Sequence, residues 1–461
     1  MSALRSLRAL PARTRSARRL CSYLTVDTIN PVVVEAQYAV RGELVLRAAA
    51  MKAKLKEDPN AFPFSKLVEC NIGNPQALQQ APLSFNREVL SLVVNRSLLD
   101  APAATELFAP DAIARAKDYL AAIPSGVGAY SESQGFDLVR QQVADFIEAR
   151  DGVPARKQDI FLTDGASKGV AFVLRLVLRA RKGDGLLVPI PQYPLYSATL
   201  ALQSATLLGY ELDEAAGWTL PISLLEEQVA KAKADGVTPR ALAVINPGNP
   251  TGNCLPYDNM EEVIRFCGRE GLVLMADEVY QENIWDASLP FHSFKKVLAQ
   301  MKDAPRVQLA SFHSTSKGFI GECGLRGGYF ELVGFEPEVQ AQLLKLVSIG
   351  LCSNTLGQIG TGLMVKPPAP GEPSHDKYAE EKGAILSSLK RRATRLVEAL
   401  NALEGVSCNQ PQGAMYLFPQ ITLPPKAVAA AEAAGKVPSR CLLLRALLWN
   451  SNRELCETGC P

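Results

Sequence analysis

Residues 314–329 read Ser-Thr-Ser-Lys-Gly-Phe-Ile-Gly-Glu-Cys-Gly-Leu-Arg-Gly-Gly-Tyr. The apolar residues 307–312 before this stretch, and residues 328–333 at its end, predict two buried strands. Lys317 is therefore expected just after a strand, among small residues, where its amine can be buried and held deprotonated. A neutral lysine amine attacks aldehydes. Taken alone, however, the pattern is more typical of a surface lysine in a glycine-rich loop.

The neighbours of Lys317 suit a phosphate group. Ser314 offers a hydroxyl, and Arg326, nine residues after the lysine, offers a guanidinium that can bind phosphate through two parallel hydrogen bonds. If Lys317 is buried, this combination would suit an aldehyde cofactor that carries a phosphate.

The composition is that of a globular protein with more than one core. The chain has 461 residues, of which 47% are hydrophobic and 21% charged, and its length suggests one large and one small domain. A net charge of +2 gives no sign of polyanion binding, and no apolar run is long enough to predict a transmembrane helix. With 3 histidines and no C-x-x-C pair among 10 cysteines, we expect no metal site.

Residues 1–22 differ from the rest of the chain. They contain six arginines, and no acidic residue occurs before Asp27. This composition is typical of a targeting presequence, and arginine is abundant enough relative to serine and threonine to favour the mitochondrion over a plastid. A disordered basic tail is the alternative interpretation.

Strands and helices alternate between residues 159 and 333. Further strands are predicted at 159–163, 185–189, 241–245 and 271–276, with helices between them. This alternation predicts an α/β fold with a mostly parallel sheet covered on both faces, which binds ligands beyond the carboxyl ends of its strands. After a proline-rich break at 367–371, a charged helix at 378–403 and strands at 406–408 and 413–418 predict a smaller α+β domain.

Polar motifs follow the predicted strands. Asp164-Gly165-Ala166-Ser167 can form a phosphate cradle at a helix N-terminus, although N-capping alone would explain it. Tyr193, held between two prolines, can stack on a planar ring or simply pack in a turn.

Two more motifs complete the set. Residues 246–252 read Asn-Pro-Gly-Asn-Pro-Thr-Gly, a rigid turn in which Asn249 can bond a phenolic oxygen. Asp277 follows an apolar strand and can keep a pyridine nitrogen protonated, and Tyr280 lies within reach of the same ring.

Each motif alone has an ordinary structural explanation, but five of them in one order, each at a strand end, do not. Together they resemble the fold-type I pyridoxal-phosphate-dependent aminotransferases, over about residues 29–440. The resemblance implies a three-layer α/β large domain and a smaller α+β domain. Residues 35–42, 128–135 and 321–329, and the nine-residue spacing from Lys317 to Arg326, are similar to the alanine aminotransferase subgroup.

The resemblance also implies the role of each residue. Lys317 would be the catalytic Schiff-base lysine, Asp277 would pair with the pyridinium nitrogen, and Gly73 would meet the substrate carboxylate. Tyr130 would reach the phosphate of a second subunit, which implies a homodimer. The other residues expected to bind the cofactor are Ala166, Ser167, Tyr193, Asn249, Tyr280, Ser314 and Arg326.

The implied reaction converts L-alanine and 2-oxoglutarate to pyruvate and L-glutamate, with glutamate–glyoxylate transamination as an alternative. The similarity fades after about residue 437, and residues 438–461 contain no Phe-Arg pair of the kind that binds the substrate carboxylate in the family. The small domain is therefore expected to be C-terminally incomplete, and a protein that binds pyridoxal phosphate without turnover is a further alternative.

The expected division of the chain has four parts. A presequence covers residues 1–22, and an N-terminal arm with part of the small domain covers 23–75. The large cofactor-binding domain covers 76–366, and the small C-terminal domain covers 367–461.

Overall fold

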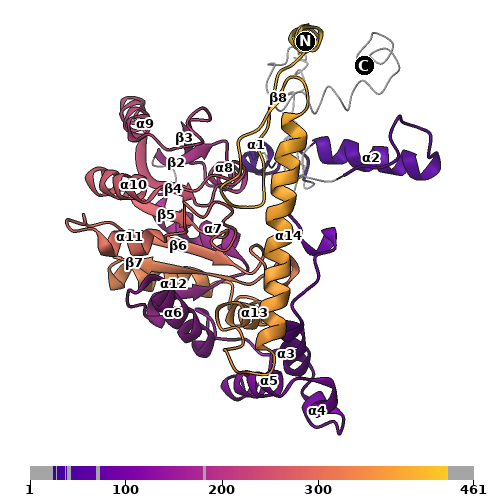
Figure 1. Ribbon diagram of the computed structural model, residues 1–461. Coiled ribbons are helices and arrows are strands. Elements are labelled where there is room, and N and C mark those ends of the chain that lie inside the picture. Colours follow the sequence, from indigo (N-terminus) through magenta and orange to yellow (C-terminus); the bar gives the residue numbers. More distant parts are fainter. Residues whose placement is uncertain are drawn as a thin grey trace, which may run out of the picture.

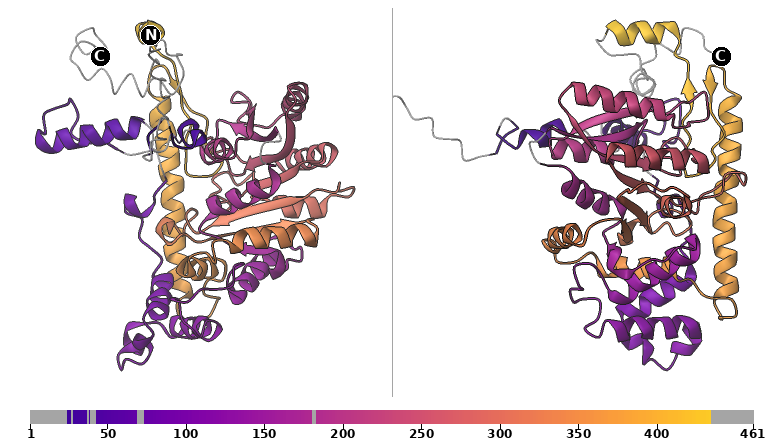
Figure 2. Two further views of the ribbon diagram at one scale, coloured as in Figure 1. Left: turned by 180° about the vertical axis from the view of Figure 1, so that it is seen from behind. Right: turned by 90° about the vertical axis from the view of Figure 1, so that its left-hand side faces the viewer.

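A computed structural model describes residues 24–26, 28–36, 38, 43–68, 73–179 and 183–433 of the chain. The predicted presequence and the tail from residue 434 onward lie outside these ranges. The described part is built around a twisted sheet with helices on both sides, and the long helix α14 (His375–Asn401) runs along one side of the molecule (Figures 1 and 2).

The sheet has seven strands in the order β1-β7-β6-β5-β4-β2-β3. All neighbouring pairs are parallel except those of β7, which is antiparallel to both β6 and β1. The strands are β1 (Ile160–Leu162), β2 (Asp184–Ile190), β3 (Thr206–Glu211), β4 (Thr238–Ile245), β5 (Val273–Asp277), β6 (Leu309–Ser314) and β7 (Gly328–Val333). Because β7 alone is reversed, six strands end at the edge where β7 begins.

Helices cover the sheet and extend beyond it. Those with residues in the two cores flanking the sheet are α7 (Ala166–Val177), α8 (Leu195–Leu202), α9 (Ile222–Ala234), α10 (Tyr257–Glu270), α11 (Phe294–Gln300) and α12 (Pro337–Ser348). A third cluster is formed mainly by α3 (Ser84–Val94), α5 (Pro110–Ala122), α6 (Asp137–Asp151) and α13 (Thr355–Val365). The remaining helices are α1 (Pro31–Glu35), α2 (Glu43–Glu57), α4 (Ala104–Leu107) and α15 (Pro425–Ala433), with short 3₁₀ turns such as η2 (Gln76–Leu78) and η5 (Cys323–Leu325).

Successive side chains along a strand point to opposite faces of the sheet and so enter different cores. On β6, Ala310 and Phe312 face the core that contains α7 and α12, while Leu309 faces the core that contains α9, α10 and α11. Helix α7 lies close to the sheet because Gly169 presents no side chain: a Cβ there would lie 2.9 Å from the ring of Phe330. These layers confirm the expected α/β architecture with a mostly parallel sheet.

Six predicted strands are confirmed, but β3 was missed. It is an edge strand whose residues alternate between exposed and buried, so it lacks the continuous apolar run of the inner strands.

The strand expected at residues 413–418 is wrong. Ala414 has a left-handed backbone (φ 60°), and the amides of Gly413 and Ala414 bond the carbonyls of Gly252 and Asn283 at 2.8 and 2.9 Å. These contacts attach the segment to the large sheet's loops. Instead, β8 (Val406–Ser407) pairs with β9 (Gln420–Ile421).

Phe330 provides a test of the central core. Its side chain is fully buried and stacks on Phe161 with ring centroids 5.0 Å apart, so Phe330→Ala would leave a cavity between α7 and the sheet. We expect a loss of about 3–5 kcal/mol in the free energy of unfolding, measured by urea denaturation. Leu396→Ala, at a half-exposed position of α14, serves as the control and should cost less than about 0.5 kcal/mol. Equal losses would contradict this packing.

Candidate active site

The predicted motifs meet at the carboxyl edge of the sheet. Asp277 is the last residue of β5, Ser314 is the last residue of β6, and Asn249 follows β4. Tyr193 lies between β2 and α8, and Ala166 opens α7 after β1. The register of the parallel strands therefore brings together residues that are far apart in sequence.

Lys317 lies in the turn after β6 and is half-buried. Its Nζ donates a hydrogen bond to the carbonyl oxygen of Gly73 at 2.7 Å. Gly73 also donates its amide to the Tyr416 hydroxyl at 3.3 Å. A Cβ at position 73 would lie 2.7 Å from that hydroxyl and 3.0 Å from the lysine Nζ, so the close approach requires glycine. The structure thus joins the segment that begins at Gly73 to the lysine turn.

Arg326 and the start of α7 form a compact site for an anion. The Arg326 Nη2 lies 2.8 Å from the Asp164 carbonyl oxygen and 3.4 Å from the Ser167 Oγ. The first amides of α7, at Ala166 and Ser167, lack intrahelical acceptors and form the positive end of the helix. Gly165 has φ +78°, and a Cβ there would lie 2.6 Å from the same Nη2. The backbone, the guanidinium and a hydroxyl thus gather as a phosphate requires.

Asp277 is buried and only partly hydrogen-bonded. The Tyr196 hydroxyl donates to its Oδ2 at 3.1 Å, whereas Oδ1 has no hydrogen-bond partner within the described ranges. Burial raises the pKa of Asp277 to about 6, although the Tyr196 bond, the Val279 amide and the charge of Lys317 act in the opposite direction. A buried carboxylate with one free oxygen is suited to accept a hydrogen bond from a cationic N–H.

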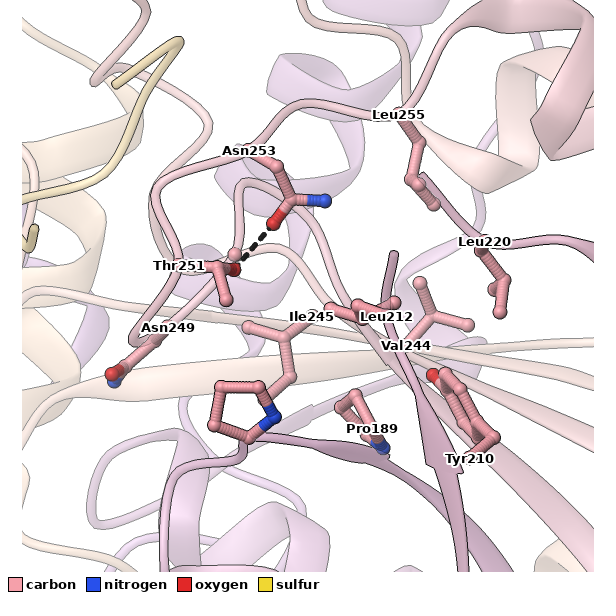
Figure 3. A pocket seen from close by; sticks show the side chains of 12 residues that line it. Pro189, Tyr210, Leu212, Leu220, Val244, Ile245, Asn249, Thr251, Asn253 and Leu255 are labelled. Carbon is pink, nitrogen blue, oxygen red and sulfur yellow. Dashed lines mark hydrogen bonds between the residues drawn. The ribbon is translucent and has the colours of Figure 1, made fainter. Parts of the chain in front are cut away.

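Three other predicted residues lie around this carboxylate or in the adjoining turns. Tyr280 is buried, and its hydroxyl makes no hydrogen bond to a described residue. Burial raises the pKa of Tyr280 well above its ordinary value. The Tyr193 hydroxyl lies 2.9 Å from that of Tyr38. Asn249 is one of the residues that line a small cavity of about 10 Å³ (Figure 3). That cavity is large enough for about one water molecule and is therefore not the cofactor site.

The turn that carries Asn249 is held from within. The Thr251 hydroxyl donates to the Asn253 Oδ1 at 2.6 Å (Figure 3), and the Asn253 amide donates to the Trp218 carbonyl at 3.0 Å. Gly248 fits only because it has no side chain: a Cβ would lie 2.0 Å from the Asn253 Oδ1.

Tyr130 is the one predicted site residue that does not join the others. Its side chain is 77% exposed within this chain. Other described residues contact the predicted ones although their roles were not predicted, namely Tyr38, Tyr196, Cys323 and Tyr416. Tyr196 follows Tyr193 by three residues at the start of α8, which places it on the same side of that turn. Tyr38 occurs in the segment 35–42 discussed above, but no local pattern predicts the contacts of Tyr38 or Tyr416.

These features fit pyridoxal phosphate. Lys317 supplies an amine, Arg326 and α7 surround an anion site, and Asp277 has a free buried oxygen for a ring N–H. The family model for aminotransferase class I and II matches residues 87–446. The chain belongs to this family. It is therefore a pyridoxal-phosphate-dependent aminotransferase, and its expected fold-type I architecture is confirmed.

Individual relatives agree with this family. The chain is 53% identical over 426 residues to "Alanine aminotransferase 1, mitochondrial" of Arabidopsis thaliana, covering 92% of this chain and 78% of the relative. It is 50% identical over 426 residues to "Glutamate–glyoxylate aminotransferase 1" of the same plant, covering 92% and 86%. Among solved structures, alanine aminotransferase from Pyrococcus furiosus has a TM-score of 0.68 at 23% identity, covering 88% of this chain and 89% of that one, which supports the fold. Within the described ranges, no helix is both long and apolar enough to cross a membrane.

Asp277→Asn tests the electrostatic cost of this aminotransferase site. Because burial raises the pKa from 3.8 to about 6, the folded state binds this proton more tightly than the unfolded state does. The stability that the protonated Asp277 carboxyl adds to the folded state is therefore fully present below about pH 4. It is lost as the pH rises to about 6, and it stays lost above that pH. Without cofactor, the variant should match the unchanged protein near pH 4 and exceed it near pH 8 by about 2–3 kcal/mol in urea unfolding. A difference independent of pH would contradict this origin.

Proposed function

We propose that this aminotransferase transfers the amino group of L-alanine to 2-oxoglutarate, producing pyruvate and L-glutamate. The observation that carries the proposal is the contact between the Lys317 amine and the Gly73 carbonyl. This contact supports the proposed roles of Lys317 as the proton carrier and of Gly73 as the backbone that meets the substrate carboxylate. The choice of alanine is supported by the stretch 321–329, by the spacing of Lys317 and Arg326, and by a relative named alanine aminotransferase.

The proposed binding residues divide by the part of pyridoxal phosphate that they hold. Arg326, Ser167, Ser314 and the amide of Ala166 bind the phosphate, and Asp277 pairs with the ring nitrogen. Tyr193 stacks on the ring, while Asn249 and Tyr280 bond its hydroxyl. The unpartnered Asp277 Oδ1 and Tyr280 hydroxyl support this arrangement, because each is buried and would gain a partner.

When bound, pyridoxal phosphate supplies an aldehyde that takes up the amino group and a ring that accepts the electron pair left at the substrate Cα. Lys317 would remove the Cα proton as a general base and, as a general acid, would deliver it to the carbon that was the aldehyde carbon of the cofactor. The Gly73 carbonyl orients the lysine Nζ during this transfer. The negative charge of Asp277 keeps the ring nitrogen protonated.

The finer assignments form part of the same proposal. We infer a homodimer in which Tyr130 binds the phosphate in the opposite subunit, supported by its exposure and its absence from its own chain's site. We propose a mitochondrial location, supported by the arginine-rich residues 1–22 and by a relative named mitochondrial. We also propose that the chain divides at residues 76 and 367 into an N-terminal segment, a large domain and a small domain.

Initial rates separate this function from its alternatives. With L-glutamate as amino donor, we expect pyruvate to give a higher kcat/KM than glyoxylate, because the site resembles the alanine subgroup. The reverse order would favour the glutamate–glyoxylate activity, which the 50% identical relative makes the second candidate. Cofactor binding without turnover of alanine or glutamate would contradict both.

Lys317→Ala tests the catalytic lysine. Without the amine, proton transfer at Cα loses its carrier, and we expect kcat to fall at least about a thousandfold. Borohydride treatment followed by peptide mass spectrometry should locate the cofactor on residue 317 of the unchanged protein and find none there in the variant. Lys345→Ala, at an exposed position of α12, is the matched control and should retain both properties.

Subunit mixing tests Tyr130. A dimer of one Lys317→Ala chain and one Tyr130→Ala chain contains one site with both defects and one intact site, provided that Tyr130 serves the opposite subunit. Co-expressed, separately tagged chains should then be more active than the mean of the two variant homodimers. If Tyr130 serves its own chain, both sites are defective and activity stays at or below that mean.

A further inference from the structure

We propose that Arg87 is a positioning residue of this active site, because its guanidinium ties the segment that begins at Gly73 to the loop that carries Lys317 and Arg326. The inference rests on the proposed function, in which Lys317 is the catalytic lysine. Arg87 lies on α3, outside the strand-end motifs, and touches none of the groups proposed to bind cofactor or substrate.

The guanidinium contacts both segments at once. Its Nε donates to one carboxylate oxygen of Glu322 at 3.0 Å, and its Nη2 donates to the other at 2.9 Å. The same Nη2 donates to the Gln76 Oε1 at 3.1 Å. Glu322 lies between Lys317 and Arg326 in sequence, and Gln76 lies three residues after Gly73. One side chain therefore spans the two segments whose backbones meet at the lysine amine.

Both segments need such support because little regular structure holds them. From Gly73 to α3 the chain has only the 3₁₀ turn η2, and from β6 to β7 only η5. A second contact joins them nearby, since the Gln80 amide donates to the Phe319 carbonyl at 2.9 Å. Gly321 accommodates Gln80 closely: a Cβ there would lie 2.7 Å from its Nε2. The two segments thus form one packed unit with Arg87 at its rim.

Arginine fits this position better than lysine. Two parallel hydrogen bonds to one carboxylate and a third to an amide need a planar fork, whereas an ammonium group is a compact point charge. The side chain of Glu322 is only 7% exposed while that of Arg87 is 47% exposed, so the carboxylate depends on this partner. Shortening the partner leaves a buried carboxylate poorly compensated, which displaces the loop toward water.

The backbone that carries Arg87 is fixed. Leu83, Phe85 and Val89 at the start of α3 are buried, and the Ser84 amide bonds a carboxylate oxygen of Glu381 at 2.9 Å. The hydrogen bonds of the guanidinium therefore restrain Gln76 and Glu322 relative to α3. A shift of the lysine amine relative to the Gly73 carbonyl would slow proton transfer, since misplacement by about 1 Å can cost about a hundredfold in rate.

Arg87→Lys is the principal test. We expect a fall of about tenfold in kcat/KM for L-alanine and a larger primary isotope effect with α-deuterated L-alanine, because proton transfer becomes more rate-limiting. Cofactor retention on dialysis should change little, since Arg326 keeps its bonds to Asp164 and Cys323. Glu322→Gln should reproduce the kinetic effect, and the double variant should be no worse than either single one.

Arg156→Lys is the matched control. Arg156 also forms a bidentate pair, with Asp159, at 2.7 and 3.0 Å, and its side chain is 72% exposed against 11% for the carboxylate. That pair precedes β1 and so lies at the opposite edge of the sheet from the site. If Arg87→Lys and Arg156→Lys lower the melting temperature alike and neither changes the isotope effect, Arg87 is merely structural and the inference is wrong.

Hydrogen–deuterium exchange provides a readout that does not depend on turnover. In the cofactor-loaded protein, Arg87→Lys should raise exchange in residues 73–80 and 316–326 together, while Arg156→Lys should leave both unchanged. Faster exchange confined to α3 would overturn the proposed tie. An unchanged protein that fails to transaminate alanine would instead contradict the proposed function, and the exchange result would still decide whether Arg87 joins the two segments.

Discussion

The reversal of β7 is the constraint on which the site depends. Strands β1 and β6 run in the same direction, and β7 lies between them in the opposite direction, so it begins where they end. Arg326, two residues before β7, is thereby delivered to the Asp164 carbonyl and to the start of α7. Gly328 permits this closeness, since a Cβ there would lie 2.9 Å from the Cα of Gly165. One reversed strand therefore places Arg326 and the start of α7 next to the turn that carries Lys317.

The inner sheet could be predicted from the sequence because its strands are continuous apolar runs, and continuity is the signature of burial on both faces. The rule that an apolar run predicts a strand failed at the edge of the sheet and in residues 413–418. The edge strand β3 contains exposed residues and was missed. Residues 413–418 have a strand-like composition, yet Ala414 adopts a left-handed backbone because its neighbours bond distant loops. Local pattern carries little information about such contacts.

The candidate site divides in the same way. Lys317, Arg326, Asp277 and the start of α7 follow from residue type and position after a strand. The Tyr196–Asp277, Tyr38–Tyr193 and Arg87–Glu322 contacts join residues separated by 81, 155 and 235 positions. Each is a single side-chain pair with no periodic signal, so only the folded chain reveals it. Asp277 shows why these contacts matter: burial opposes its charge, and the Tyr196 hydroxyl offsets part of that cost.

The residues around the Lys317 amine are therefore held in two ways, by the hydrogen bonds of the sheet and by single side-chain contacts. Asp277 and Ser314 are held by the ladder of the sheet, whereas Gly73 and Lys317 lie on segments held by side chains. Helix α14 contacts the second kind of support at α3 and at the lysine loop. Glu381 accepts hydrogen bonds from Ser84 at the start of α3, and the Lys382 Nζ lies 4.2 Å from the centre of the Phe319 ring. The Tyr378 ring also meets Phe85 and Phe319 edge-on. Helix α14, which leads to the β8–β9 sheet, thus packs on α3, which carries Arg87, and on the loop that Arg87 contacts through Glu322. Because both α3 and the lysine loop pack on α14, this helix helps to fix the two segments that meet at Lys317.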